Sequence, residues 1–169
     1  AAPEADRLFR SVWAMSPSIL QLRTLDDGER FERAYLDLLG RESIADADLG
    51  DILDAQAKMD ASTAGMQNFA PTAGADPFGE SILDRAAADP RPVVIGTNRD
   101  EMLLFTAFDP SRREWSDAHV EREFGHRFGS RTAEAIDAYR RHRPDAGPSE
   151  LVSAMQTDQV FRYPAQRLA

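Results

Sequence analysis

The stretch Val93-Val94-Ile95-Gly96-Thr97-Asn98-Arg99-Asp100-Glu101 decides the fold class, because a strand signal leads directly into two carboxylates. Consecutive β-branched residues after the chain-breaking segment 89–92 predict a parallel strand that is covered on both faces. Open α/β sheets bind ligands outside the carboxyl ends of their strands. Glu101 is therefore a candidate functional residue, with Asp100 beside it, although an acid pair at this place also suits a helix cap or a salt bridge.

A second strand is predicted at Ser11-Val12-Trp13-Ala14-Met15, which is apolar and is followed by the turn-prone Ser16-Pro17-Ser18. Periodic apolar residues predict helices elsewhere, and residues 61–79 are expected to form a long irregular connection. The expected helices cover 27–39 with a stop at Gly40, a segment with Leu49, Ile52 and Leu53, about 80–88, segments capped by Ser116, Ser130 and Ser149, and 157–169, where Pro164 is expected to bend or begin a helix.

Two strands among many helices are too few for a self-sufficient parallel sheet. The sequence thus predicts the α/β class and an incomplete fold: part of a mostly parallel sheet with surrounding helices. Within it we expect a helical insertion at about 24–65, a core strand with an acid-bearing loop at 92–105, and a helical region at 114–169.

The composition limits the partners. Acidic residues outnumber basic ones 29 to 20 among 169 residues, and the formal net charge of −9 repels phosphate backbones and anionic lipids. We therefore expect no nucleic-acid partner. No apolar run approaches the ~20 residues of a membrane span, and no signal peptide is expected at the start. The chain has no cysteine, so a cytoplasmic location is favoured and a secreted one is possible.

The residues for nucleophilic catalysis are incomplete. A hydrolase nucleophile needs the strained elbow G-x-S-x-G, and its nearest counterpart, Gly79-Glu80-Ser81, is followed by large apolar residues. His119, His126 and His142 lie among charges on predicted helices and are expected to be solvated. None follows the His-Glu-x-x-His metal pattern, so no metal site and no cofactor are predicted.

Four segments, in the right order, resemble type-B carboxylesterases. Gly96-Thr97-Asn98-Arg99-Asp100-Glu101 is similar to that family's acid-bearing segment, and residues 8–16 are similar to the strand that follows its nucleophile. Phe69-Ala70-Pro71 resembles its Phe-x-Pro segment, and 157–169 resembles a helix with a Thr-Asp, a Phe and a Pro. The chain departs from the family pattern at Met102, where the family usually has Gly, and at Met15-Ser16-Pro17, where it has Gln-Ser-Gly.

The resemblance implies an α/β-hydrolase in which Glu101 is the acid of a catalytic triad. It also implies that Ser16 and Asp100 support the acid and that Leu104 and Phe105 line the acyl pocket, although a run such as 103–105 is also typical of core packing. The nucleophile would precede Ala1 and the catalytic histidine would follow Ala169. The partners would be a small ester and the remainder of the hydrolase, and this chain alone would be inactive.

Two other functions are compatible with the sequence. One is a non-catalytic, cholinesterase-like module for binding or adhesion. The other is an acidic helical interaction domain, which would unfold cooperatively by itself and would be mostly helical.

Overall fold

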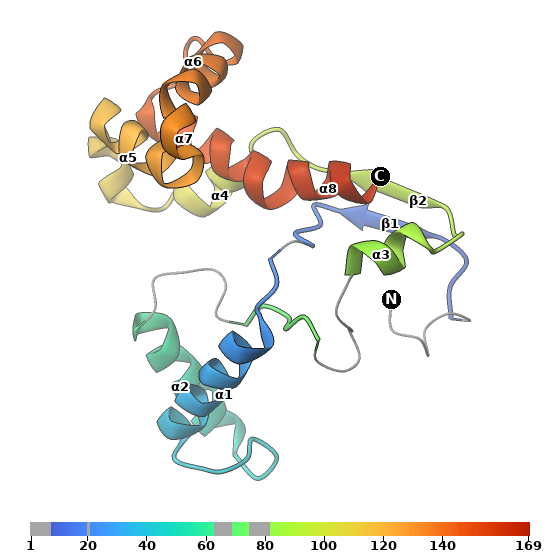
Figure 1. The fold of residues 1–169 in the computed structure, drawn as a ribbon. Coiled ribbons are helices and arrows are strands. Elements are labelled where there is room, and N and C mark those ends of the chain that lie inside the picture. Colours follow the sequence, from blue (N-terminus) through green and yellow to red (C-terminus); the bar gives the residue numbers. More distant parts are fainter. Residues whose placement is uncertain (1–7, 20, 63–68, 75–81) are drawn as a thin grey trace. The chain divides into compact units, whose positions relative to one another are not determined.

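The computed structural model describes residues 8–19, 21–62, 69–74 and 82–169 (Figure 1). They form two compact units. The first consists of the described parts of Ala1–Phe9 and Gln21–Pro90, and the second consists of the described parts of Arg10–Leu20 and Arg91–Ala169. The elements are β1 (Val12–Met15), α1 (Leu25–Leu39), α2 (Leu49–Ser62), α3 (Ile82–Ala87), β2 (Val93–Gly96), α4 (Glu101–Thr106), the 3-10 turn η2 (Pro110–Glu114), α5 (Asp117–Phe128), the 3-10 turn η3 (Gly129–Arg131), α6 (Thr132–His142), α7 (Pro148–Thr157), the π turn η4 (Asp158–Arg162) and α8 (Tyr163–Leu168).

The first unit contains α1 and α2, which pack side by side. Thr24 caps the start of α1 by accepting the Asp27 N–H at 3.2 Å, so the helix begins two residues before the predicted start at Asp27. Gly40 ends the helix at a φ of 68°, as predicted. The shared core is Tyr35, Ala55 and Met59. The predicted apolar face of α2 was partly wrong: Leu49 and Leu53 are exposed, because the face that packs into the core is that of Ala55 and Met59.

The predicted irregular connection is described only in part. Residues 69–74 include a short bridge in which the Arg23 N–H donates to the Pro71 carbonyl and the Ala73 N–H donates to the Arg23 carbonyl, both at 2.9 Å. Residues 63–68 and 75–81 lie outside the described residues, and with them Ser81 and the expected start of the helix at Glu80. The described part of that helix is α3.

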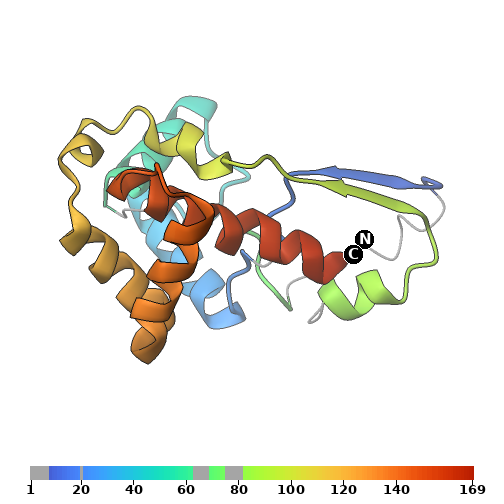
Figure 2. The same cartoon turned by 90° about the horizontal axis from the view of Figure 1, so that it is seen from above.

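The second unit contains the sheet. β1 and β2 run parallel and side by side, with Val12 opposite Val93 and Met15 opposite Gly96 (Figure 2). Both predicted strands and their parallel arrangement are confirmed. The expected burial was wrong, because Trp13 is 73% and Met15 76% exposed. Only two strands pair in the described part of the chain, and the exposure of their side chains shows that this sheet lacks the layers that cover a complete parallel sheet.

The helices α5, α6 and α7 form the main core of the second unit. Six buried residues pack there: Val120, Phe124, Ile136, Leu151, Val152 and Met155. The cap at Ser116 is confirmed, since its N–H donates to His119 Nδ1 at 3.1 Å. The sequence thus predicted the helical region and its inward face at Phe124 and Ile136.

The caps predicted at Ser130 and Ser149 were wrong. Ser130 lies inside the turn η3, and α6 begins after Arg131, which pairs with Glu134. Ser149 lies in the first turn of α7, because Pro148 occupies the first helical position, where its missing N–H costs no hydrogen bond. The Gly147 N–H before it donates to Glu150 Oε2 at 2.8 Å.

The π turn η4 joins α7 to α8. The Tyr163 N–H donates to the Asp158 carbonyl, five residues back, and Pro164 follows in the first turn of α8. Proline cannot donate to the helical ladder and its ring crowds the preceding turn. The prediction that Pro164 bends or begins a helix is confirmed. Among the described residues, no helix is both long and apolar enough to span a membrane.

Candidate active site

Glu101 is the first residue of α4, which follows the short turn 97–100 at the carboxyl end of β2. Its carboxylate accepts the Ser16 hydroxyl and the Asn98 N–H on Oε1, the latter at 2.6 Å. Oε2 accepts the Asn98 side-chain amide at 3.0 Å. The strand end and the first helical turn therefore hold this carboxylate at the edge where parallel sheets carry their ligands.

Ser16 lies directly after β1, the neighbouring strand, and connects the two strand ends. Its N–H donates to the Gly96 carbonyl at 2.7 Å, and its side chain donates to Glu101 across 85 positions of sequence. The backbone of Ser16 has a φ of 54°, a left-handed conformation that is uncommon for a residue with a side chain. The departure from the family pattern at 15–17 thus coincides with a strained residue.

The hydrogen bonds set the charge of Glu101. Partial burial raises the pKa of this carboxyl, but the hydrogen bonds from Ser16 and from the backbone and side chain of Asn98 outweigh burial and lower its pKa below the ordinary value. Glu101 is therefore ionised near neutral pH. A carboxylate has about four acceptor positions. Three hydrogen bonds reach it from the described residues, which leaves an acceptor position on Oε2.

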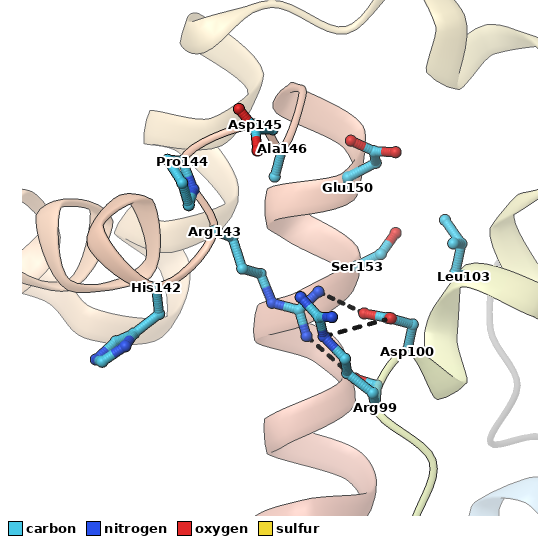
Figure 3. A pocket seen from close by; sticks show the side chains of 10 residues that line it. All are labelled: Arg99, Asp100, Leu103, His142, Arg143, Pro144, Asp145, Ala146, Glu150 and Ser153. Carbon is cyan, nitrogen blue, oxygen red and sulfur yellow. Dashed lines mark hydrogen bonds and ion pairs between the residues drawn. The ribbon is translucent and has the colours of Figure 1, made fainter.

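Asp100 has a different environment from Glu101. It precedes α4 and forms an ion pair with Arg143, which also donates to the Arg99 carbonyl at 3.1 Å. The pair lines a cavity of about 300 Å³. Figure 3 shows His142, which also lines this cavity, pointing away from Asp100. The alternative of a salt-bridge partner is thus confirmed for Asp100, which contacts Arg143.

Leu104 and Phe105 project from α4 and are 66% and 53% exposed. The Phe105 ring stacks on Phe161 at 6.5 Å between centroids. Core packing, the alternative interpretation of 103–105, is wrong for Leu104 and Phe105 in this chain. An exposed apolar surface one turn after Glu101 is compatible with a pocket wall.

Sequence reasoning missed the groups that hold the acid segment from outside. The Met102 N–H donates to Thr157 Oγ1 at 3.0 Å, and this buried hydroxyl comes from the end of α7. Arg143 and Arg162 both donate to the Arg99 carbonyl. Thr157 and Arg162 lie within the last segment that resembles the family, but no spacing rule connects them to residue 99.

Among the described residues, none of the three histidines forms a hydrogen bond with Glu101, whose partners are Ser16 and Asn98. His126 and His142 are exposed, as predicted. His119 is half-buried, caps α5 and stacks on Trp115 with 5.5 Å between ring centroids. Within the described ranges, no group of three His, Asp or Glu side chains is arranged to hold a metal ion.

A similarity to known proteins was found for the structure of this chain and not for its sequence. No family model and no curated protein matches the sequence. The crystal structure of the carboxylesterase EST55 of Geobacillus stearothermophilus at pH 6.2 matches 99% of this chain, with a TM-score of 0.78 and 25% sequence identity. This chain has the fold of one part of a carboxylesterase.

The family resemblance and the incomplete α/β-hydrolase fold predicted from the sequence are thereby confirmed. The match covers 36% of the EST55 chain, so this chain spans about a third of the carboxylesterase that it matches. The two-stranded parallel sheet and its exposed faces are consistent with a segment of a larger carboxylesterase sheet.

Proposed function

We propose that this chain supplies the triad acid, Glu101, to a serine carboxylesterase whose nucleophile and histidine come from segments outside these 169 residues. One observation carries the proposal: an ionised carboxylate, held by Ser16 and Asn98, at the carboxyl end of a parallel strand. The likeness to a carboxylesterase over almost the whole chain supports it.

The proposed role of Glu101 is to accept the Nδ1–H of the catalytic histidine. The acceptor position left on Oε2 suits this bond. The carboxylate would fix the tautomer of the imidazole and stabilise the imidazolium that forms when the imidazole deprotonates the serine hydroxyl. The lowered pKa of Glu101 supports this role, because the acid must be charged when the imidazolium appears.

The proposed substrates are small carboxylic esters, which would be cleaved through an acyl-enzyme without a cofactor. Leu104 and Phe105 would contribute an apolar wall for the acyl group, and their exposure on α4 supports this. The remainder of the hydrolase would be the physical partner of this chain. A cytoplasmic location also stays a prediction.

The test compares the isolated chain with a longer protein that carries it. Neither the G-x-S-x-G elbow nor a matching histidine is in this sequence, so the isolated chain should not hydrolyse p-nitrophenyl acetate. In the longer protein, Glu101→Gln should lower kcat by about 10⁴-fold, as expected when the acid that orients a triad histidine is neutralised.

The matched control is Glu134→Gln, which alters an exposed glutamate paired with Arg131 and should leave kcat unchanged. Full activity of the Glu101→Gln protein would contradict the proposal. So would a longer protein without a Gly-x-Ser-x-Gly segment upstream, which would favour a non-catalytic binding module.

A further inference from the structure

The carbonyl of Arg99, two residues before Glu101, accepts hydrogen bonds from two arginines. Arg143 Nη2 donates to it at 3.1 Å and Arg162 Nη2 at 3.0 Å, from positions 44 and 63 residues further along the chain. A carbonyl oxygen has two lone pairs, and both are used here by charged donors.

Each arginine is fixed by a second, acidic partner. Arg143 pairs with Asp100, the neighbour of the carbonyl that it holds, so one guanidinium spans two consecutive residues of the acid segment. Arg162 pairs with Asp158 one turn earlier. The side chain of Arg143 is 17% exposed and that of Asp100 is 40% exposed, so solvent screens this pair on the side of the carboxylate.

Asp158 connects the second arginine to the helical core. It accepts the Tyr139 hydroxyl at 2.7 Å, and Tyr139 packs against the core of α5, α6 and α7. Burial, together with the hydrogen bond to Asp158, raises the pKa of Tyr139 far above its usual value, so this hydroxyl stays a donor over the whole working range of pH.

The π turn η4 places these groups. Asp158 and Arg162 are its first and last residues, and Pro164 follows two residues later, in the first turn of α8. π turns insert an additional residue into a helix and occur frequently at functional sites. Here the turn presents Arg162 to the Arg99 carbonyl, and Thr157, one residue before the turn, accepts the Met102 N–H.

We propose that Arg143 and Arg162 act as positioning residues: together they clamp the Arg99 carbonyl and thereby keep the turn from Asn98 to Glu101 closed around the carboxylate. This rests on the proposed function of Glu101 as the triad acid. The turn is closed from inside by the Asn98 bonds to Glu101 and from outside by the two guanidinium groups. Among the described residues, the hydrogen bonds to the Glu101 carboxylate come from Ser16 and Asn98, so the two arginines act on it through the backbone turn and not by direct contact.

The double substitution R143K/R162K tests the clamp. Lysine keeps both charges, but an ammonium group lacks the planar fork with which Arg143 reaches Asp100 and the Arg99 carbonyl together. The pKa of Glu101 is measured by carbon NMR of its labelled side-chain carboxyl in this chain. It should rise in the double variant toward the ordinary glutamate value of about 4.3, because the Asn98 and Ser16 donors lose their fixed geometry.

The matched control is R140K, since Arg140 also belongs to the helical cluster but pairs with Asp117 at 2.8 Å, outside the acid segment. Its Glu101 pKa should equal that of the unaltered chain. If the folded double variant also keeps the lowered pKa of Glu101, the clamp is refuted. If the double variant fails to fold, the single variant R162K, which retains the Arg143–Asp100 pair, replaces it. A raised Glu101 pKa in R162K then supports the clamp, and a Glu101 pKa that stays lowered refutes it.

The readout needs no esterase activity, so it separates the clamp from the proposed function. An inert longer protein with an intact clamp would refute the catalytic role of Glu101 and leave the pKa result in place. Loss of activity in Glu101→Gln together with an unchanged Glu101 pKa in R143K/R162K would support the catalytic role of Glu101 and refute the clamp. Arginine restored at 162 in the double variant should recover part of the lowered pKa.

Discussion

The helical cluster of α5, α6 and α7 and the sheet of β1 and β2 belong to the same unit but differ in how they treat apolar side chains. The cluster encloses Phe124 completely, whereas Trp13 and Met15 on β1 face solvent for most of their surface. Burial of apolar area is the main favourable term in folding. The cluster is therefore stabilised by its own buried apolar side chains. The sheet carries apolar side chains that suit a covering layer, which the described residues do not supply.

This difference agrees with a chain that spans about a third of a carboxylesterase. Parallel sheets are normally covered on both faces, and their strands are correspondingly apolar. Such a sequence on an exposed two-stranded sheet indicates a segment of a larger layer. The candidate acid lies where the two regions meet, with Ser16 on the side of the sheet and Thr157 on the side of the helices.

The largest effect should come from emptying the helical core. Phe124 is fully buried and its ring meets Tyr139 edge-on, with 5.3 Å between centroids. Phe124→Ala should lower the free energy of unfolding by about 3–5 kcal/mol through lost burial and the cavity that remains. Urea denaturation measures the change.

Phe108→Ala is the matched control for this substitution, because Phe108 is among the most exposed apolar residues of the chain. It should change the free energy of unfolding by less than about 0.5 kcal/mol. Equal losses for the two substitutions would remove the contrast between core and exposed surface.

The next effect concerns the contact between α7 and the acid segment. Thr157→Val keeps the shape of the side chain but removes the buried acceptor of the Met102 N–H. An unsatisfied buried donor costs about 1–3 kcal/mol, and the Met102 amide should exchange its hydrogen faster. Thr132→Val is the control: its hydroxyl bonds the exposed Gly129 carbonyl, which water can replace. Unchanged protection of Met102 would contradict the importance of this contact.

A smaller effect is expected at the end of β1. Ser16→Ala removes the hydroxyl that helps to lower the pKa of Glu101 and keeps the strained φ, whereas Ser16→Gly removes the hydroxyl and relieves the strain. Both variants should raise the pKa of Glu101. The glycine variant should be more stable than the alanine variant by about 1 kcal/mol.

The sign of the pH dependence follows from the lowered pKa of Glu101. A carboxyl whose pKa is lower in the folded state stabilises that state above its unfolded pKa of about 4.3, and this contribution is lost as the pH falls through the folded pKa. The difference between the unaltered chain and Ser16→Ala should therefore be full at pH 7 and should shrink in acid. A difference that grows below pH 4 would show that Ser16 acts otherwise.

Much of the fold could be predicted because its signals are local. The β-branched run at 93–95, the glycine stop at Gly40 and the cap at Ser116 each act within a few residues, and all three match the structure. The caps at Ser130 and Ser149 failed because a competing local signal, a 3-10 turn in one place and a proline in the other, set the helix start.

The candidate site was only half predictable. The position of Glu101 follows from the strand before it, and Ser16 came from the family resemblance. The contacts of Arg143 and Arg162 with Arg99 join residues far apart in sequence, and no periodicity encodes which exposed arginine will reach which carbonyl. The residues of the strands could not predict the exposure of the sheet, because a strand's sequence records the layers it suits and not whether they are present. Only the number of strands indicated that the fold is incomplete.

The smallest effect tests this last point on Trp13. Trp13→Ser should change the stability of the isolated chain by less than about 0.5 kcal/mol, because the ring is already exposed. Binding of an apolar dye should fall. In a longer protein where the sheet is covered, the same substitution should cost about 3 kcal/mol or more.

Trp115 provides the internal control, since its ring packs against the helical core and lies under Arg112 at 4.3 Å. Trp115→Ser should destabilise the isolated chain and the longer protein to a similar extent, because the cluster that surrounds it is complete in both. The ratio of the two effects for Trp13 then measures how much of the sheet's stability depends on the neighbouring layers. Equal costs for Trp13→Ser in both settings would mean that the sheet is left uncovered in the longer protein too.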